Sequence, residues 1–135
     1  MGKLVRVGTI YIPVLDVKKS VNWYVENLDA ILTYEDEDKG IINLANVSVF
    51  LVKALENQVN SFQDVNDNMC FPVTFEVDGL NNLLILHQEF VQKGIKVGEI
   101  EDRGHAGNNF IFYDLDNNMF DVWSELSPSF KQSLK

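Results

Sequence analysis

The sequence contains the same order of segments twice, at an offset of about 63 residues. Each half begins with an alternating, β-branched segment, at residues 7–14 in the first half and 71–77 in the second. An acidic turn and a segment with helical periodicity follow in both halves. Because the two halves share this order, we expect each of them to form the same supersecondary unit.

The helices have the clearest local signals. In the first half, Asp16 is suited to the N-cap position, and apolar residues recur at helical spacing over 17–28. In the second half, Asp78 or Asn81 can cap a helix whose apolar face follows, and Gly94 is suited to the position just after its last turn. The sequence therefore predicts one amphipathic helix in each half.

Three extended segments are expected after each helix. They are residues 31–34, 41–44 and 47–53 in the first half, and residues 95–101, 109–113 and 119–123 in the second. All of them are short and rich in apolar or β-branched residues, which is typical of strands. Each half is thus predicted to have the order β-α-β-β-β.

The chain has 135 residues, which is enough for one domain with a sizeable core. We expect a single domain over 1–135, with module one at about 5–54 and module two at about 69–126. The segment at about 55–68 is polar and has no strong period, so we expect a linker that carries a short helical turn. The tail at 128–135 is expected to be a frayed end.

Charge and composition exclude several classes of partner. The net charge is -9 at pH 7, and the sequence has no basic stripe, which argues against nucleic acid and against anionic membrane surfaces. No run of about 18 apolar residues is present, so no membrane span is expected. Cys70 is the only cysteine, and no disulfide can form within the chain. We expect a cytoplasmic protein.

Residues 112–123, which read FYDLDNNMFDVW, resemble the last hairpin of a vicinal oxygen chelate module. This is the family of glyoxalases, bleomycin-resistance proteins and extradiol dioxygenases. Further matches are the V-x-D-hydrophobic-x-x-S pattern at 14–20, the aromatic pair Trp23 and Tyr24, and the loop at Gly107. Together they cover nearly the whole chain. The resemblance implies an α+β fold in which two tandem β-α-β-β-β modules form a curved mixed sheet around a cavity.

The resemblance also implies a homodimer, because short members of the family often pair so that modules from both chains complete the sites. Metal-dependent members use four ligand positions, which correspond here to Thr9, Phe50, Pro72 and Asp121. Divalent metals prefer carboxylate or imidazole ligands, and the first three residues supply neither. We therefore expect no metal and no cofactor, with Asp121 as a lone acidic group.

Residues two apart along a strand lie on the same face of a sheet, so these four positions indicate which neighbours line the open face. The loop 103–107 lies at the mouth of the cavity in the family, which adds His105. The expected ligand-binding residues are Tyr11, Thr74, Glu76, His105, Asp121 and Trp123. Such a site suits a small organic ligand with an aromatic or cationic group, held by charge and by cation–π contact.

Three hypotheses about function follow. The leading one is a metal-free small-molecule-binding protein that sequesters a toxic or antibiotic compound. The second is an enzyme of the same superfamily, a lyase, thiol transferase or dioxygenase-like protein. It would use Asp121 with nonstandard metal ligands such as His105 and Glu76, or would work without metal with His105 as candidate catalytic base. The third is a regulatory or structural domain whose cavity is filled by its own side chains.

Overall fold

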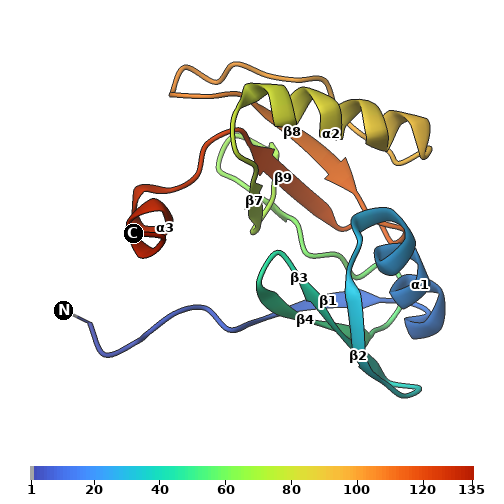
Figure 1. The fold of residues 1–135 in the computed structure, drawn as a ribbon. Helices are drawn as coiled ribbons and strands as arrows, with labels where there is room; N and C mark the ends of the chain where they lie inside the picture. The colour runs from blue at the N-terminus through green and yellow to red at the C-terminus, as the bar shows by residue number, and fades with distance from the viewer. Residues whose placement is uncertain (1) are drawn as a thin grey trace. The chain divides into compact units, whose positions relative to one another are not determined.

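The computed structural model describes residues 2–135. The chain divides into two compact units, Met1–Asn60 and Ser61–Lys135, which we call unit one and unit two. Figure 1 shows helices and mixed sheets in both units, so the predicted α+β class is confirmed. The boundaries of the modules, and their arrangement around a cavity, stay predictions.

Unit one has the predicted order β-α-β-β-β. Its elements are β1 Thr9–Val14, α1 Val17–Leu28, β2 Ile31–Glu35, β3 Lys39–Leu44 and β4 Val47–Lys53. They form one sheet in the order β1-β4-β3-β2, in which β1 runs parallel to β4 and the other neighbours are antiparallel. Helix α1 packs against β2, β3 and β4 on one face of this sheet, and we call the opposite face the open face of unit one.

The local signals of unit one are confirmed in detail. The side chain of Asp16 accepts a hydrogen bond from the backbone amide of Lys19 at 3.1 Å, as expected of an N-cap. Val17, Val21 and Tyr24 of α1 are buried. Gly40 allows the close approach of β3 to α1, since a Cβ atom there would clash with a methyl carbon of Val21.

Unit two contains one more hairpin and one more helix than predicted. Its elements are β5 Phe62–Gln63, β6 Met69–Cys70, β7 Thr74–Glu76, α2 Leu80–Gln92, β8 Asn109–Tyr113, β9 Met119–Trp123 and α3 Pro128–Ser133. The main sheet has the order β7-β9-β8, with β7 parallel and β8 antiparallel to β9. The arrangement repeats the parallel pairing of β1 with β4 in unit one.

Two predictions about the loops and tail are wrong. The segment at 55–68 carries strand β5 instead of a helical turn, and β5 pairs with β6. Asp64 closes the turn between them, because its carboxylate accepts hydrogen bonds from the backbone amides of Asn66 and Asn68. The tail expected to be frayed forms α3 over Pro128–Ser133.

Two predictions around α2 need correction as well. The N-cap of α2 is Gly79, without a side-chain cap, in place of the predicted Asp78 or Asn81. The predicted strand at 95–101 is irregular. It meets β8 only through the bridges Val97 to Phe112 and Glu101 to Asn109. Gly94 does follow the last turn of α2 with a positive φ of 76°, as predicted.

The two faces of the unit-two sheet differ in chemistry. Phe110 and Phe112 of β8 face α2, where the ring of Phe90 lies 5.9 and 5.0 Å from theirs. Strand alternation places every second residue on the other face. The register puts eight residues on that face, namely Thr74, Glu76, Asn109, Ile111, Tyr113, Met119, Asp121 and Trp123. This second face, which we call the open face of unit two, holds most of the predicted site.

Candidate functional site

Asp121 lies at the centre of the open face of unit two. It stands opposite Thr74 of β7 and opposite Ile111 of β8 in the strand register. The Thr74 hydroxyl and the Asn109 amide nitrogen both donate hydrogen bonds to Oδ2 of Asp121, at 3.0 and 2.9 Å. Asp121 is only 2% exposed. A buried charge of this kind needs a partner of opposite sign.

Arg103 supplies that partner. Its Nη2 atom lies 3.1 Å from Oδ1 of Asp121 and 3.3 Å from the carboxylate of Glu101. The guanidinium carbon lies 5.3 Å from the centre of the Phe71 ring, within range of a cation–π contact. The expectation that Asp121 is a lone acidic group is therefore wrong.

The same surroundings raise the pKa of Arg103. Partial burial opposes the charged form, but the hydrogen bond to Glu101 and the charges of Asp121 and Glu101 outweigh it. The guanidinium is thus held in its charged state beside Asp121.

Two acceptor atoms of this cluster have no hydrogen-bond donor. They are Oδ1 of Asn109 and Oδ1 of Asp121, and both are buried. Oδ1 of Asp121 is nevertheless engaged by the charge of Arg103, whose Nη2 lies 3.1 Å away, so the acceptor without a partner is Oδ1 of Asn109. Asn109 therefore keeps one acceptor oxygen without a donor, and its side-chain nitrogen, which donates to Asp121, carries a second N–H group.

Trp123 and His105 lie beside this cluster. The indole nitrogen of Trp123 donates a hydrogen bond to the carbonyl oxygen of Ala106 at 2.9 Å. The rings of His105 and Trp123 pack edge to face, with centres 5.9 Å apart. Gly107 is required at this point, because a Cβ atom there would lie 2.9 Å from the indole nitrogen and its φ is +75°.

His105 is exposed, and its Nδ1 lies 2.8 Å from the carbonyl oxygen of Ala106. A carbonyl can only accept, so Nδ1 carries the proton and Nε2 is the acceptor in the neutral ring. The predicted base is thus on the surface of a loop, next to the aromatic side chain of Trp123.

Glu76 has a structural partner within its own unit. Its carboxylate accepts hydrogen bonds from the backbone amide of Ser127 at 2.9 Å and from the Ser127 hydroxyl. Ser127 precedes the first residue of α3. Glu76 therefore attaches α3 to strand β7, although its register position opposite Trp123 is the predicted one.

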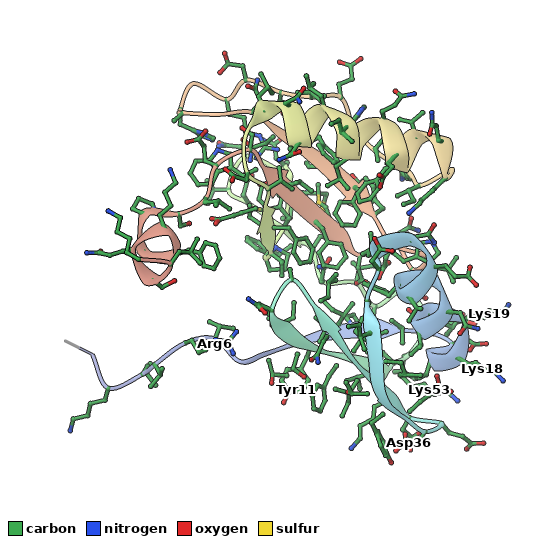
Figure 2. All side chains as sticks on the ribbon, viewed as in Figure 1. Arg6, Tyr11, Lys18, Lys19, Asp36 and Lys53 are labelled. Atoms are coloured by element: carbon green, nitrogen blue, oxygen red, sulfur yellow. The ribbon has the colours of Figure 1, made fainter. Side chains whose placement is uncertain are left out.

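Tyr11 belongs to unit one, whereas the other predicted site residues belong to unit two. It is 66% exposed and stands opposite Phe50 on the open face of the unit-one sheet, with ring centres 5.2 Å apart. Figure 2 labels Tyr11 on this unit. Thr9 is opposite Ser48 in the same register, two residues before Tyr11.

The donor set does not fit a divalent metal ion. Thr9, Phe50 and Pro72 offer no carboxylate or imidazole, and the carboxylate of Asp121 is already engaged by Arg103, Thr74 and Asn109. Within residues 2–135, no three His, Cys, Asp or Glu side chains gather as a metal site would require.

The fold and the sequence identify the family. The Glyoxalase/Bleomycin resistance protein/Dioxygenase superfamily matches residues 6–122, so the chain belongs to this superfamily. Curated protein sequences give no match. In the described part of the chain, no helix is long and apolar enough to cross a membrane.

Solved structures of several proteins are similar to this one in fold. Fosfomycin resistance protein FosX from Listeria monocytogenes, in complex with Mn(II) and sulfate, superposes with a TM-score of 0.72 at 13% identity, covering 100% of both chains. A glyoxylase/bleomycin resistance protein/dioxygenase domain from Frankia sp. EAN1pec gives 0.70 at 19% identity, covering 90% of this chain and 98% of that one. Lactoylglutathione lyase from Agrobacterium tumefaciens gives a TM-score of 0.71 at 9% identity, covering 90% of this chain and 95% of that one. At such identities the likeness concerns the fold.

Sequence reasoning missed two members of the cluster, Asn109 and Arg103. Asn109 begins β8, and alternation from a buried Phe110 would have placed it on the open face. Arg103 has no such signal, because it lies in a loop whose path the sequence does not specify. The loop had been singled out for His105, two residues further along.

Proposed function

We propose that this protein is a small-molecule-binding member of the superfamily that works without a bound metal ion. The observation that carries the proposal is the ion pair between Arg103 and Asp121, at the position where metal-dependent members place a carboxylate ligand. Arg103 of the same chain supplies the positive charge that Asp121 needs. The metalloenzyme alternative is not supported, because Glu76 is bonded to Ser127 and lies outside any grouping with Asp121 and His105.

The proposed ligand is a small organic compound with an aromatic or apolar body. Phe71 lies against Arg103, and the rings of His105 and Trp123 pack against each other, so these side chains offer flat surfaces for such a body. The expectation of a cationic group rested partly on an unpaired Asp121, and the Arg103 contact removes that part of the argument. We propose that the protein sequesters a toxic or antibiotic compound, as a homodimer in the cytoplasm.

A thermal-shift screen tests this proposal. The purified protein is screened against aromatic compounds and antibiotics, with fosfomycin and bleomycin included because of the superfamily. A ligand at 100 times its dissociation constant adds about 2.7 kcal/mol to the free energy of unfolding. We expect Trp123→Ala to abolish the shift of a positive compound, while Leu84→Ala on the half-exposed surface of α2 preserves it.

Metal analysis of protein purified without chelator provides the complementary test. The proposal predicts substoichiometric Zn, Ni, Mn and Fe, and an unfolding temperature that EDTA does not change. One equivalent of any of these metals, lost together with stability on EDTA treatment, would contradict it. A shift that survives Trp123→Ala unchanged would place the ligand elsewhere.

A further inference from the structure

The C-terminal segment, residues 126–135, is bonded to the rest of unit two at one place. The Glu76 carboxylate accepts a hydrogen bond from the Ser127 backbone amide through Oε1, at 2.9 Å, and another from the Ser127 hydroxyl through Oε2. Within residues 2–135, the other hydrogen bonds of this segment stay inside it, such as that from the amide of Lys131 to the carbonyl of Ser127. The two donors of Ser127 therefore hold the segment in place.

Helix α3, which forms most of this segment, has little packing of its own. It contains no buried residue, and residues 128–135 are all exposed. Figure 1 shows α3 clear of the three strands, at the end of the chain. A helix of 6 residues is also too short to be stable by itself in water. The order of α3 therefore depends on the contact between Ser127 and Glu76.

Glu76 lies on the open face of unit two. It stands opposite Trp123 in the strand register, on the face that also holds Asp121. Asp121 is paired with Arg103, so Glu76 is the carboxylate of this face that has no cationic partner. While Ser127 is bound, both oxygens of Glu76 are engaged. Release of Ser127 therefore frees a carboxylate on the open face.

The C-terminal segment has the chemistry of a cationic, aromatic ligand. It contains Phe130, Lys131 and Lys135 and no acidic residue, in a chain whose net charge is -9. Its two donors from Ser127 reach the two oxygens of one carboxylate, which is how a guanidinium or amidinium group binds a carboxylate. A ligand with such a group competes for the same two oxygens. It replaces uncharged donors with charge-assisted ones, which bind more strongly.

We propose that the C-terminal segment is a latch on Glu76, and that an aromatic ligand with a guanidinium or amidinium group displaces it. The proposal rests on the small-molecule-binding function proposed above, and it names the regulation of that site and the charged group of its ligand. In the latched state, Ser127 occupies the carboxylate of Glu76. In the released state, Glu76 takes the cationic group and Trp123 takes the aromatic body.

Limited proteolysis with trypsin tests the latch. Cleavage after Lys131 requires α3 to detach and unfold locally, so its rate follows the population of the released state. Ser127→Pro removes both donors, and the φ of -60° at Ser127 suits proline. We expect this variant to be cleaved after Lys131 at least about tenfold faster than the wild-type protein, which corresponds to about 1.4 kcal/mol. Glu76→Ala should be cleaved as fast.

Two further variants calibrate the cleavage rates. Ser127→Ala removes the hydroxyl and keeps the backbone amide, so it should give an intermediate rate. Ser129→Ala is the matched control, because Ser129 lies in α3 and its side chain makes no hydrogen bond within the described part of the chain. We expect the control to be cleaved at the wild-type rate to within about twofold, as for other surface substitutions.

Phenylguanidine and phenylurea test what the latch covers. The two compounds have nearly the same shape, but the first is a cation and the second is neutral. NMR titrations that follow the Glu76 carboxyl carbon and the Trp123 indole N–H give the dissociation constants. We expect phenylguanidine to bind Ser127→Pro at least about tenfold more tightly than the wild-type protein, because apparent affinity scales with the released population. Phenylurea should bind both proteins alike, and Glu76→Ala should lose the preference for phenylguanidine.

Each outcome decides between the proposals. Equal cleavage of the wild-type protein, Ser127→Pro and Glu76→Ala overturns the latch. Faster cleavage with an unchanged affinity for phenylguanidine overturns the claim that the latch controls a ligand position. If either result comes with a screened compound whose stabilising effect depends on Trp123, the binding function stands without the latch. If no compound stabilises the protein and phenylguanidine binds none of the variants, both proposals fail.

Discussion

The two units share one plan and differ in the chemistry of their open faces. In unit one, Tyr11 stands opposite Phe50 on neighbouring parallel strands, and Tyr11 is exposed. In unit two, Thr74 and Asp121 occupy the equivalent register, and Asp121 is buried. One repeat thus presents an aromatic pair, and the other presents a polar pair with a charge. The repeat of a fold does not imply the repeat of a site.

The difference arises in the connection that precedes the second-to-last strand. In unit one this connection is the tight turn at 36–38, which Asp36 closes through bonds to the amides of Asp38 and Lys39. In unit two it is the longer loop 102–108, which brings Arg103 to the sheet. A loop, and not the sheet, therefore brings the positive charge to Asp121.

The largest predicted effect is that of Asp121→Ala in unit two. Removing the carboxylate leaves Arg103 facing the sheet without Asp121, and Thr74 and Asn109 lose their acceptor, so we expect a loss of about 3–5 kcal/mol. Chemical denaturation measures it. The control is Asp36→Ala in unit one, an exposed aspartate whose replacement should lower the free energy of unfolding much less. Equal losses of stability in the two variants would contradict the proposed difference between the two units.

Gly107→Ala should have the next largest effect. The new Cβ would lie 2.7 Å from Ser124 Oγ and 2.8 Å from a carbon of Glu125, in addition to the strain of φ +75°. Gly94→Ala is a matched control, because Gly94 has φ +76° and nothing within 4 Å of a Cβ. We expect the free energy of unfolding to fall by about 1–2 kcal/mol in the control. In Gly107→Ala we expect it to fall by about 1–3 kcal/mol more. Similar losses of stability would mean that the loop shifts freely.

The smallest effect concerns the pKa of Asp36 in the tight turn of unit one, labelled in Figure 2. The hydrogen bond from the Tyr34 hydroxyl, and then those from the amides of Asp38 and Lys39, lower this pKa below its ordinary value of 3.8. The stability that Asp36 contributes is therefore present above that value and is lost as pH falls through the lowered pKa.

Tyr34→Phe should accordingly raise the pKa of Asp36 towards its ordinary value. An NMR titration of the Asp36 carboxyl carbon follows the change, with Tyr11→Phe as the control that should leave it unaltered. An unchanged pKa in Tyr34→Phe would show that the backbone amides alone hold the turn.

The sequence predicted most of the local structure. The cap at Asp16, the helix over 17–28 and the strand over 47–53 were predicted because their signals lie within a few residues. Strand alternation also predicted that Thr74 and Asp121 lie on a common face, and the pairing of β7 with β9 agrees.

The contacts that define the candidate site could not be predicted, because they join distant residues. Arg103 reaches Asp121 across a loop without regular structure, and Glu76 binds Ser127 from the far end of the unit. Nothing in the sequence indicates that the acidic side chains of Asp121 and Glu76 have these partners. Periodicity indicates which face a residue takes, but not which distant side chain arrives there.

A double-mutant cycle on Arg103 and Asp121 tests the central claim most directly. Arg103→Gln, Asp121→Asn and the double variant are compared by chemical denaturation, without added metal. The ion pair predicts a coupling energy of about 2 kcal/mol, so that the double variant is much more stable than the sum of the single losses implies. Additive losses, to within about 0.5 kcal/mol, would contradict the claim that Arg103 provides the positive charge for Asp121.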